Sequence, residues 1–248
     1  MPQQVLDFLI WDMMEGLHVT IDESTIAGRR VFVFGDVHGC YDELVKLLAR
    51  ADETAPGNIL YISVGDLINR GPMSAQVVSL VRNRGILSVR GNHEENFLKN
   101  LAVMSKKMQL AQDFTEEDIN FLQNLPYTIT IPSLKAIIVH AGIIPGLPLA
   151  NQDTYTLTCM RNVVETKSGG YRPYSETDQG VAWASVWLGP EHVYYGHDAR
   201  RGRDGIQRHE FATGLDTRCV KGGQLSGVFL DGAKEVLSVP AKMTYFSG

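Results

Sequence analysis

Continuous apolar runs alternate with segments of helical pattern in the first half of the chain. Three runs have the character of strands buried on both faces: 31–34, 59–64 and 86–89. Leu44, Leu47 and Leu48 repeat at helical spacing after the first run, and residues 74–83 have the same pattern after the second. Strands that alternate with helices in this way predict βαβ units and a parallel sheet.

The pattern changes after residue 93. We expect a helix to start near His93, and residues 105–125 also look helical, with the capping-box sequence Thr115-Glu116-Glu117-Asp118 at one helix start. Short β-like runs then follow between turns, and several could pair antiparallel: 127–131, 136–139, 193–195, 210–212, 225–230 and 235–239. The least regular segment is 145–190, and long irregular segments in compact domains often line functional sites.

These elements predict an α/β fold of two packed mixed β-sheets flanked by helices. A chain of 248 residues with 44% apolar composition suits one domain, which we place at 29–248 after an N-terminal extension, 1–28. The apolar run at 5–14 is interrupted by acidic residues and follows no basic residue. It therefore predicts an amphipathic helix packed on the domain rather than a signal peptide or a membrane span, with a partner-docking helix as the alternative.

Charge and cysteine usage exclude several classes of protein. A net charge of −5 argues against DNA binding, which needs basic surface to displace counterions, although metals can let an acidic protein bind phosphates. Cys40, Cys159 and Cys219 are far apart and lack CxxC spacing, which argues against a disulfide framework and a thiolate zinc site. We expect an intracellular, cytoplasmic protein with no membrane partner; the pattern does not indicate an oligomeric state.

Residue types that bind metals follow five of the predicted strands. They are Asp36 and His38 in GDVHG (35–39), Asp66 in GDLINRGP (65–72), Asn92 and His93 in GNHEEN (91–96), His140 in VHAG and His197 in YGHDA. Because ligands gather at the carboxyl ends of strands in open α/β sheets, we expect these side chains to meet. Mixed oxygen and imidazole ligands suit Mn, Fe or Zn better than Ca or Mg.

Each of these features also has a structural interpretation. Gly-Asp after a strand is a common turn, and a lone His140 or His197 could be a hydrogen-bonded core histidine. The basic loop Arg200-Arg201-Gly202-Arg203 could bind outer phosphates or RNA, or it could be a solvated turn. Four aromatic residues could stack on a nucleobase or belong to the core: Tyr171, Tyr174, Trp183 and Trp187. The succession of five strand-end turns, each with a ligand type, argues against chance assembly.

The five blocks also resemble a known family. Together with GLDTRCVKGGQLSGV (214–228), they resemble the signature blocks of the phosphoprotein-phosphatase branch of the calcineurin-like metallophosphoesterases, from about residue 31 to the end of the chain. Within that branch the chain is most similar to the symmetrical diadenosine tetraphosphatases and to diadenosine-tetraphosphatase-like enzymes. The resemblance implies the metallophosphoesterase sandwich fold.

The resemblance also implies a site with two divalent metal ions, with Mn expected and Fe, Zn or Co as alternatives. One metal would be held by Asp36, His38 and Asp66, and the second by Asp66, Asn92, His140 and His197. The resemblance casts His93 as the general acid and Arg70 as a phosphate clamp. A second clamping arginine comes from the irregular region, and here it is expected to be Arg161, with Arg172 as the alternative.

Asn69 departs from the pattern of the branch. Protein phosphatases have an aspartate at this position, which pairs with the catalytic histidine, raises its pKa and fixes its tautomer. Asn69 has no charge; it could still hold the ring of His93 through its carbonyl oxygen, but it would leave His93 less basic and less well held as an acid. A serine alkoxide leaving group needs that proton, whereas a nucleotide phosphate, with a second pKa of about 6, leaves nearly unaided. Asn69 therefore favours cleavage of phosphoanhydrides, and the following Arg70-Gly71-Pro72 resembles the same segment of the diadenosine tetraphosphatases, which also lack an acid at this position.

The sequence thus predicts a dimetal phosphohydrolase that acts on dinucleoside polyphosphates. RNA 5′ caps contain the same kind of anhydride and are a second class of substrate. The alternative is a protein serine/threonine phosphatase in which Asn69 is a tolerated change, and GNHE is indeed closer to the protein phosphatases. A more remote alternative, a binding module without catalysis, does not fit the complete set of ligands.

Overall fold

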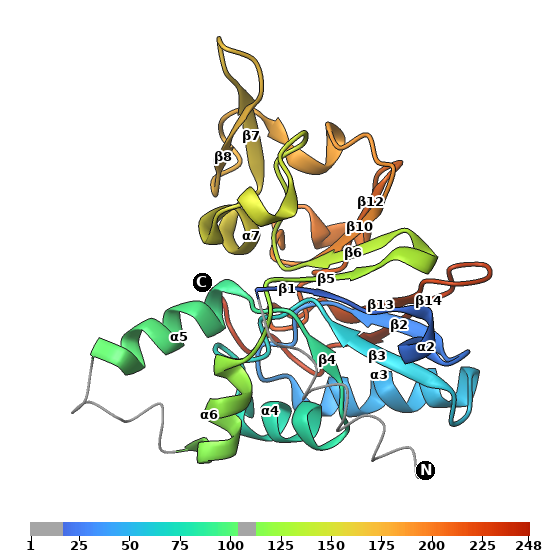
Figure 1. Cartoon of the computed structure of the whole chain (residues 1–248). Helices are drawn as coiled ribbons and strands as arrows, with labels where there is room; N and C mark the ends of the chain where they lie inside the picture. The colour runs from blue at the N-terminus through green and yellow to red at the C-terminus, as the bar shows by residue number, and fades with distance from the viewer. Residues whose placement is uncertain (1–16, 104–112) are drawn as a thin grey trace.

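The computed structural model describes residues 17–103 and 113–248, so the helix expected at 5–14 lies outside the described residues. Two mixed sheets pack face to face (Figure 1). The helices α3 (Tyr41–Thr54) and α4 (Ser74–Asn83) lie below the lower sheet in this view, and α7 (Thr154–Cys159) lies above the upper one. The predicted α/β class with two packed sheets and flanking helices is confirmed.

The lower sheet has five strands and contains the predicted βαβ units. Its order along the sheet is β14 (Val236–Pro240), β13 (Gln224–Phe229), β2 (Arg30–Phe34), β3 (Ile59–Ser63) and β4 (Leu87–Ser88). The strands β2, β3 and β4 are parallel, with α3 and α4 as the crossovers, and β13 pairs antiparallel with β2 and β14. Val31 and Val33 pack between the sheets while Phe32 and Phe34 pack against the helices, as expected of a strand buried on both faces.

The upper sheet has six strands and differs from the expectation in two respects. Its order is β1 (His18–Thr20), β5 (Thr128–Ile131), β6 (Ala136–Val139), β10 (His192–Tyr195), β12 (Ala212–Gly214) and β11 (Gln207–Arg208). The strand predicted at 210–212 begins at Ala212, because its pairing with β10 starts at Val193. The strand β1, in the expected N-terminal extension, pairs parallel with β5 and forms the edge of the sheet.

The segment 145–190 is more regular than its composition predicts. It contains α7 and a third sheet, which the expectation of two sheets missed, made of β7 (Asn162–Glu165), β8 (Tyr171–Tyr174) and β9 (Val181–Ala182). Its strands are short and partly exposed, so their side chains show no buried apolar alternation that would mark them in the sequence. The third sheet stands above the six-stranded sheet (Figure 1).

The remaining helices range from 4 to 12 residues in length. They are α2 (Glu23–Ile26), α5 (Asn92–Val103) and α6 (Glu116–Gln123), with 3-10 turns at Pro132–Leu134, Leu149–Asn151, Trp183–Ser185 and Gly202–Asp204. The helix expected near His93 is α5, and the capping box at Thr115 is confirmed at the start of α6. Within the described ranges, no helix is both long and apolar enough to span a membrane.

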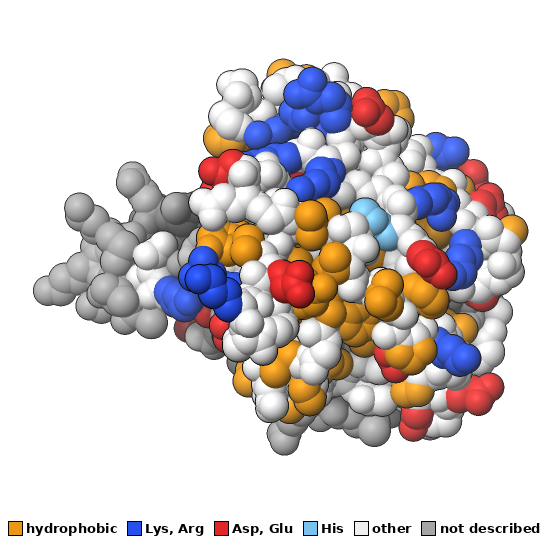
Figure 2. Space-filling model, turned by 90° about the horizontal axis from the view of Figure 1, so that it is seen from above, with side chains coloured by type: hydrophobic (Ala, Val, Ile, Leu, Met, Phe, Trp, Pro, Cys, Tyr) orange, Lys and Arg blue, Asp and Glu red, His pale blue; other side chains and the backbone are white. Residues whose placement is uncertain are grey.

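Figure 2 looks down on the face at the top of Figure 1. Hydrophobic side chains gather near the middle of this face, with Lys and Arg side chains around them. An apolar hollow in the segment 145–190 is lined by Leu147, Tyr171, Trp187 and Leu188, among others. Trp183, by contrast, is buried and packs edge-on against Tyr195, so it belongs to the core.

Candidate metal centre

The structure brings the predicted ligand residues together at the carboxyl ends of the strands. Oδ2 of Asp66 lies 3.5 Å from Nε2 of His38 and 3.4 Å from Nε2 of His140. Oδ1 of Asn92 lies 3.1 Å from Nε2 of His140 and 2.9 Å from Nδ1 of His197. A cavity of about 270 Å³ opens at this point, and Asp36 also lines it.

Asp66 belongs to two groups of ligand atoms. One consists of His38, Asp66 and His93, the other of Asp66, His140 and His197, and within each group the ligand atoms lie within 4.8 Å of one another. One carboxylate shared by two groups is the arrangement that holds two metals close together.

Backbone carbonyls orient the three histidines. Each ring has one nitrogen on a carbonyl oxygen: His38 Nδ1 on Ile68 at 3.0 Å, His140 Nδ1 on Val64 at 2.9 Å and His197 Nε2 on Cys159 at 3.0 Å. A carbonyl oxygen only accepts, so these nitrogens carry the ring protons. Burial lowers the pKa of His38 to about 4 and also lowers the pKa of His140 and of His197, so the rings are neutral. The other nitrogen of each ring therefore presents a lone pair to the site.

The lone pairs of His140 and His197 face oxygen atoms that are also acceptors. Oδ2 of Asp66 and Oδ1 of Asn92 lie against Nε2 of His140, and the same Asn92 oxygen lies against Nδ1 of His197. Acceptors that converge without a donor repel one another unless a cation lies between them. The donor set of imidazole nitrogens and carboxylate and amide oxygens therefore fits divalent transition metals.

Two further buried carboxylates, those of Asp36 and Asp216, also indicate a place for positive charge in the site. Burial, together with the charges of Asp216 and Asp66, raises the pKa of Asp36 well above its ordinary value. Burial raises the pKa of Asp216 to about 6, with Asp66 and Asp198 adding to the effect. Buried like charges are costly unless a positive charge compensates them, which divalent metals would do. Asp216 was not a candidate from the sequence, although it lies in the GLDTR block.

Unusual backbone conformations hold these side chains in place. Several residues of the motifs have positive φ: 47° at His38, 50° at Asp66, 71° at Asn69, 72° at Arg70 and 64° at His197. Residues other than glycine adopt such angles at a cost of about 1–3 kcal/mol each, and they cluster at functional sites. Backbone hydrogen bonds from Val37 and His38 to the Asp66 carbonyl, at 3.1 and 2.8 Å, join the first two loops and support this geometry.

Glycines in the motifs leave room for the ligand side chains. A Cβ at Gly196 would lie 2.0 Å from Oδ1 of Asp36, and one at Gly91 would lie 2.2 Å from Oδ1 of Asp66. The same Asp36 carboxylate accepts a hydrogen bond from the His197 amide at 3.1 Å, and Asp66 Oδ1 accepts one from the His93 amide at 3.0 Å. The glycine that precedes a ligand thus lets another ligand's carboxylate reach the backbone.

Gly196→Ala is expected to displace the Asp36 carboxylate and to lower turnover about 10²-fold, because a misplacement of about 1 Å can have that effect. Turnover at saturating substrate and metal content of the purified variant measure it. The control is Gly146→Ala, where nothing lies within 4 Å of the added Cβ; because Gly146 has a φ of 78°, thermal unfolding of both variants accounts for backbone strain. Equal turnover in the two variants would show that Asp36 tolerates the displacement.

Glu94 holds the loop of Asp66 in place and was not among the residues predicted from the sequence. It is buried, and its carboxylate accepts hydrogen bonds from four backbone amides: Asp66 at 2.9 Å, Leu67 at 2.9 Å, Ile68 at 3.2 Å and Gly91 at 2.9 Å. Its neighbour Glu95 instead pairs with Arg90 and Tyr127 at the edge of the fold. Nothing in GNHEEN distinguishes the two glutamates, so only the fold reveals that Glu94 anchors the loop of Asp66.

Asn69 contacts His93, but through the atom opposite to the one expected. Its side-chain nitrogen Nδ2, rather than the carbonyl oxygen, lies 3.0 Å from Nδ1 of His93. The amide therefore donates to Nδ1, which leaves the proton of the neutral ring on Nε2. Burial lowers the pKa of His93, with the positive charge of Arg70 contributing in the same direction.

Two of the three candidate arginines line the cavity. Arg70 lies with its Nη1 3.1 Å from Nε2 of His38. Arg161 donates to the carbonyls of Ser175 at 2.9 Å and His197 at 3.0 Å, which fix it at the cavity wall. Arg172 is exposed, lies over the ring of Tyr174 and does not line the cavity. The geometry therefore favours Arg161 over Arg172.

The basic loop after His197 is largely paired. Arg200 contacts Glu176 at 2.6 Å, and Arg201 pairs with Asp198 and donates to Asn162. Because Arg200 and Arg201 are paired within the protein, they are less available to bind the outer phosphates or RNA for which the sequence made them candidates.

Two of the three cysteines meet in the fold. Cys40 and Cys219 are buried free thiols, and with Glu43 they form a cluster whose ligand atoms lie within 4.8 Å of one another. A hydrogen bond with Cys40, together with burial, raises the pKa of Cys219, so the thiol stays protonated. Because these two cysteines are 179 positions apart along the chain (219 − 40), their contact could not be predicted from the sequence.

The family model described as calcineurin-like phosphoesterase matches residues 29–211. The symmetrical bis(5'-nucleosyl)-tetraphosphatase of Cronobacter sakazakii is 36% identical over 143 residues, which are 53% of this chain and 48% of that protein. The protein of the same name from Pectobacterium atrosepticum is 32% identical over 208 residues, 78% of this chain and 67% of that protein. The chain spans about half the length of several of the curated relatives it matches.

Two solved structures with phosphatase names have the same fold as this chain. A protein provisionally named diadenosine tetraphosphatase superposes with a TM-score of 0.80 at 39% identity, over 90% of this chain and 97% of that one. A protein serine/threonine phosphatase from Saccharomyces cerevisiae shares the fold, with a TM-score of 0.59 at 15% identity over 97% of this chain and 90% of that one. With a family model that matches most of its length, the chain belongs to the calcineurin-like phosphoesterases.

Proposed function

We propose that the protein is a metal-dependent hydrolase that cleaves phosphoanhydride bonds in dinucleoside polyphosphates, with diadenosine tetraphosphate as the model substrate. The observation that carries the proposal is the contact of an uncharged Asn69 with His93 beside a site for two metals. The names of the relatives and of the 39% identical structure support the same substrate class.

The family implies a dinuclear divalent metal site, and the two groups that share Asp66 support it, with His93 of the first group kept as the proton donor and Asp36, which lines the same cavity, taken as the ligand. One ion is assigned to Asp36, His38 and Asp66, the other to Asp66, Asn92, His140 and His197. Mn is the proposed metal, with Fe, Zn and Co as alternatives for the same mixed ligands. When bound, the two ions supply an activated water and positive charge for the phosphoryl group.

The side chains of the protein bind and orient the substrate. Arg70 and Arg161 line the cavity and are assigned to the charged equatorial oxygens of the phosphoryl group. The attacking water forms the new bond to phosphorus, and the bond to the departing oxygen breaks on the opposite side. His93 is assigned to that departing oxygen as the proton donor, through Nε2, with Asn69 as the residue that holds its ring.

The leaving group decides what this arrangement can cleave. A neutral imidazole held by an amide is a weak proton donor, so it serves a departing phosphate better than a departing alkoxide. Cleavage between the second and third phosphates of diadenosine tetraphosphate releases two molecules of ADP. RNA 5′ caps with the same anhydride are proposed as a second class of substrate.

Turnover of diadenosine tetraphosphate with Mn²⁺ or Co²⁺, compared with turnover of a phosphoserine peptide, tests the proposal. We expect the dinucleotide to be cleaved faster, with ADP as the product, and a triphosphate-capped RNA to be cleaved as well. A peptide rate far above the dinucleotide rate would instead assign the protein to the serine/threonine phosphatases. Cleavage to AMP and ATP would reject the symmetrical mode.

Asn69→Asp is expected to increase the rate on the phosphoserine peptide about tenfold relative to the rate on diadenosine tetraphosphate. A carboxylate against Nδ1 raises the pKa of His93, so that more of the His93 rings carry a proton to donate, which matters for an alkoxide and little for a phosphate. The ratio of the two kcat/KM values measures the effect, and Asn58→Asp, in an exposed turn, is the control. The same change on both substrates would contradict the leaving-group argument.

A further inference from the structure

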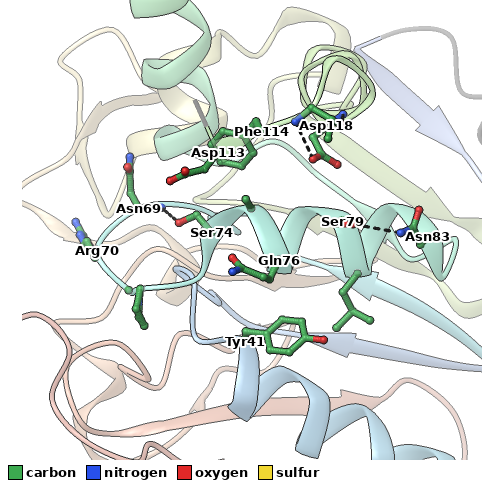
Figure 3. Close-up of a pocket in the computed structure, with 15 residues that line it drawn as sticks. Tyr41, Asn69, Arg70, Ser74, Gln76, Ser79, Asn83, Asp113, Phe114 and Asp118 are labelled. Carbon is green, nitrogen blue, oxygen red and sulfur yellow. Dashed lines mark hydrogen bonds between the residues drawn. The ribbon is translucent and has the colours of Figure 1, made fainter. Parts of the chain in front are cut away.

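A second, larger groove opens next to the metal centre along helix α4 (Figure 3). Its volume is about 790 Å³, within the range of small-molecule binding sites. Ser74, Gln76 and Ser79 of α4 line its length, while Tyr41 and Phe114 stand on opposite sides of the helix. At 1.5 Å per residue, the ten residues of α4 give the groove a length of about 15 Å.

The inner end of this groove is the leaving-group side of the metal centre. Arg70 lines both the groove and the metal cavity. Asn69 lines the groove with its side chain while its Nδ2 contacts His93 at 3.0 Å. The backbone amide of Asn69 donates to the Ser74 hydroxyl at 3.0 Å, which ties this end of the groove to the start of α4. In an in-line displacement the departing oxygen lies opposite the attacking water, and so on the side of His93.

The charge of the groove changes along its length. Among the described residues that line it, Arg70 is the one cation, and it lies at the inner end (Figure 3). Farther along, the lining consists of uncharged polar side chains such as Gln76 and Asn83, with the acidic Asp113 and Asp118. Asp118 is already engaged by Arg82 at 3.0 Å. With the acidic Asp113 and uncharged polar side chains in its lining, the outer part suits a neutral group with hydrogen-bonding edges better than a phosphate.

Two aromatic rings give that outer part a surface for a base. Tyr41 stands at the first position of α3, and Phe114, just before α6, packs on Phe97 with ring centroids 5.3 Å apart, which fixes its ring. Aromatic side chains stack on any nucleobase, since every base has a π-face. A phosphate-binding inner end followed by an uncharged, aromatic outer end matches the order of groups in a nucleotide.

We propose that this groove binds the leaving nucleotide, with its phosphates at Arg70 and its nucleoside along α4 between Tyr41 and Phe114. The inference rests on the proposed function and deepens it, because it assigns a site to one nucleoside of the substrate. It also makes Gln76 and Ser79 determinants of specificity that do not take part in the chemical step.

Filling the groove tests the proposal. Ser79→Trp places a large ring on the groove face of α4, and Ala49→Trp, at an exposed position of α3 outside the groove, is the matched control. Diadenosine tetraphosphate and p-nitrophenyl phosphate, which has no nucleoside, are the two substrates. For Ser79→Trp we expect KM for the dinucleotide to rise at least about tenfold with kcat changed by less than about twofold, the signature of lost binding that is equal in the ground and transition states. Turnover of p-nitrophenyl phosphate stays at the wild-type value.

The outcomes separate the two proposals. If the wild-type protein cleaves the dinucleotide and Ser79→Trp has the same KM as Ala49→Trp, the groove is not the nucleoside site, and the proposed function stands. If the wild-type protein cleaves p-nitrophenyl phosphate but not the dinucleotide, the proposed function fails and the groove assignment fails with it. Gln76→Trp, at an exposed position of the same helix, replaces Ser79→Trp if thermal unfolding shows that the latter is not folded.

Discussion

Asp66→Asn is expected to remove both metal ions from the purified protein and to lower turnover of diadenosine tetraphosphate at least about 10³-fold, a loss of about 4 kcal/mol of transition-state stabilisation. Oδ2 of Asp66 lies 3.5 Å from Nε2 of His38 and 3.4 Å from Nε2 of His140, and Oδ1 accepts the amide of His93. If the asparagine keeps its oxygen on that amide, its NH₂ group takes the place of Oδ2. It then donates to the two imidazole lone pairs at which a metal would bind.

This substitution therefore replaces the cation with hydrogen bonds and leaves the fold intact. Metal analysis by mass spectrometry, steady-state kinetics with added Mn²⁺ and thermal unfolding with a chelator measure the three consequences. The control is Asp52→Asn, a partly exposed aspartate that pairs with Arg84 away from the site. A variant that retains two metal ions per chain would show that Asp66 is not the shared ligand.

The sequence was sufficient to predict the parts of the fold that depend on local pattern. The parallel strands β2 and β3 are continuous apolar runs, α4 has the predicted bounds, and the capping box at Thr115 is present. The candidate ligands also meet as expected, because each follows a strand of one of the two packed sheets and the carboxyl ends of these strands meet at the site. These inferences needed only the order of the elements and the rule that ligands gather at strand ends.

The rest depends on contacts between residues far apart in the chain. Glu94 and Glu95 are identical in type and adjacent, yet one is buried on four backbone amides and the other pairs with Arg90. The atom of Asn69 that faces His93 depends on how the side-chain amide is turned in the folded site, which no pattern of residue types encodes. The groove along α4 exists because Tyr41 and Phe114, 73 positions apart (114 − 41), flank one helix.

Glu94→Gln is expected to lower the thermal midpoint by roughly 5–15 °C. In the wild-type protein Oε1 accepts the amides of Leu67 and Ile68, and Oε2 accepts those of Asp66 and Gly91. A glutamine has one oxygen, so its NH₂ group must face two backbone donors and leave them unpaired in the interior. Each buried unpaired donor costs about 1–3 kcal/mol, and 1 kcal/mol shifts the midpoint of a domain of this size by about 2–4 °C.

The loss should persist in the presence of a chelator, because it arises in the loop and not at the metals. Thermal unfolding of the metal-free protein measures it, with Glu53→Gln, an exposed glutamate of α3, as the control. Burial raises the pKa of Glu94 to about 8, while the four amide donors favour its charged form. A protonated carboxyl would already present a donor to these amides, and glutamine would then cost little. An unchanged midpoint would therefore show that Glu94 is neutral in the folded protein, and a large fall that its carboxylate holds the Asp66 loop as an anion.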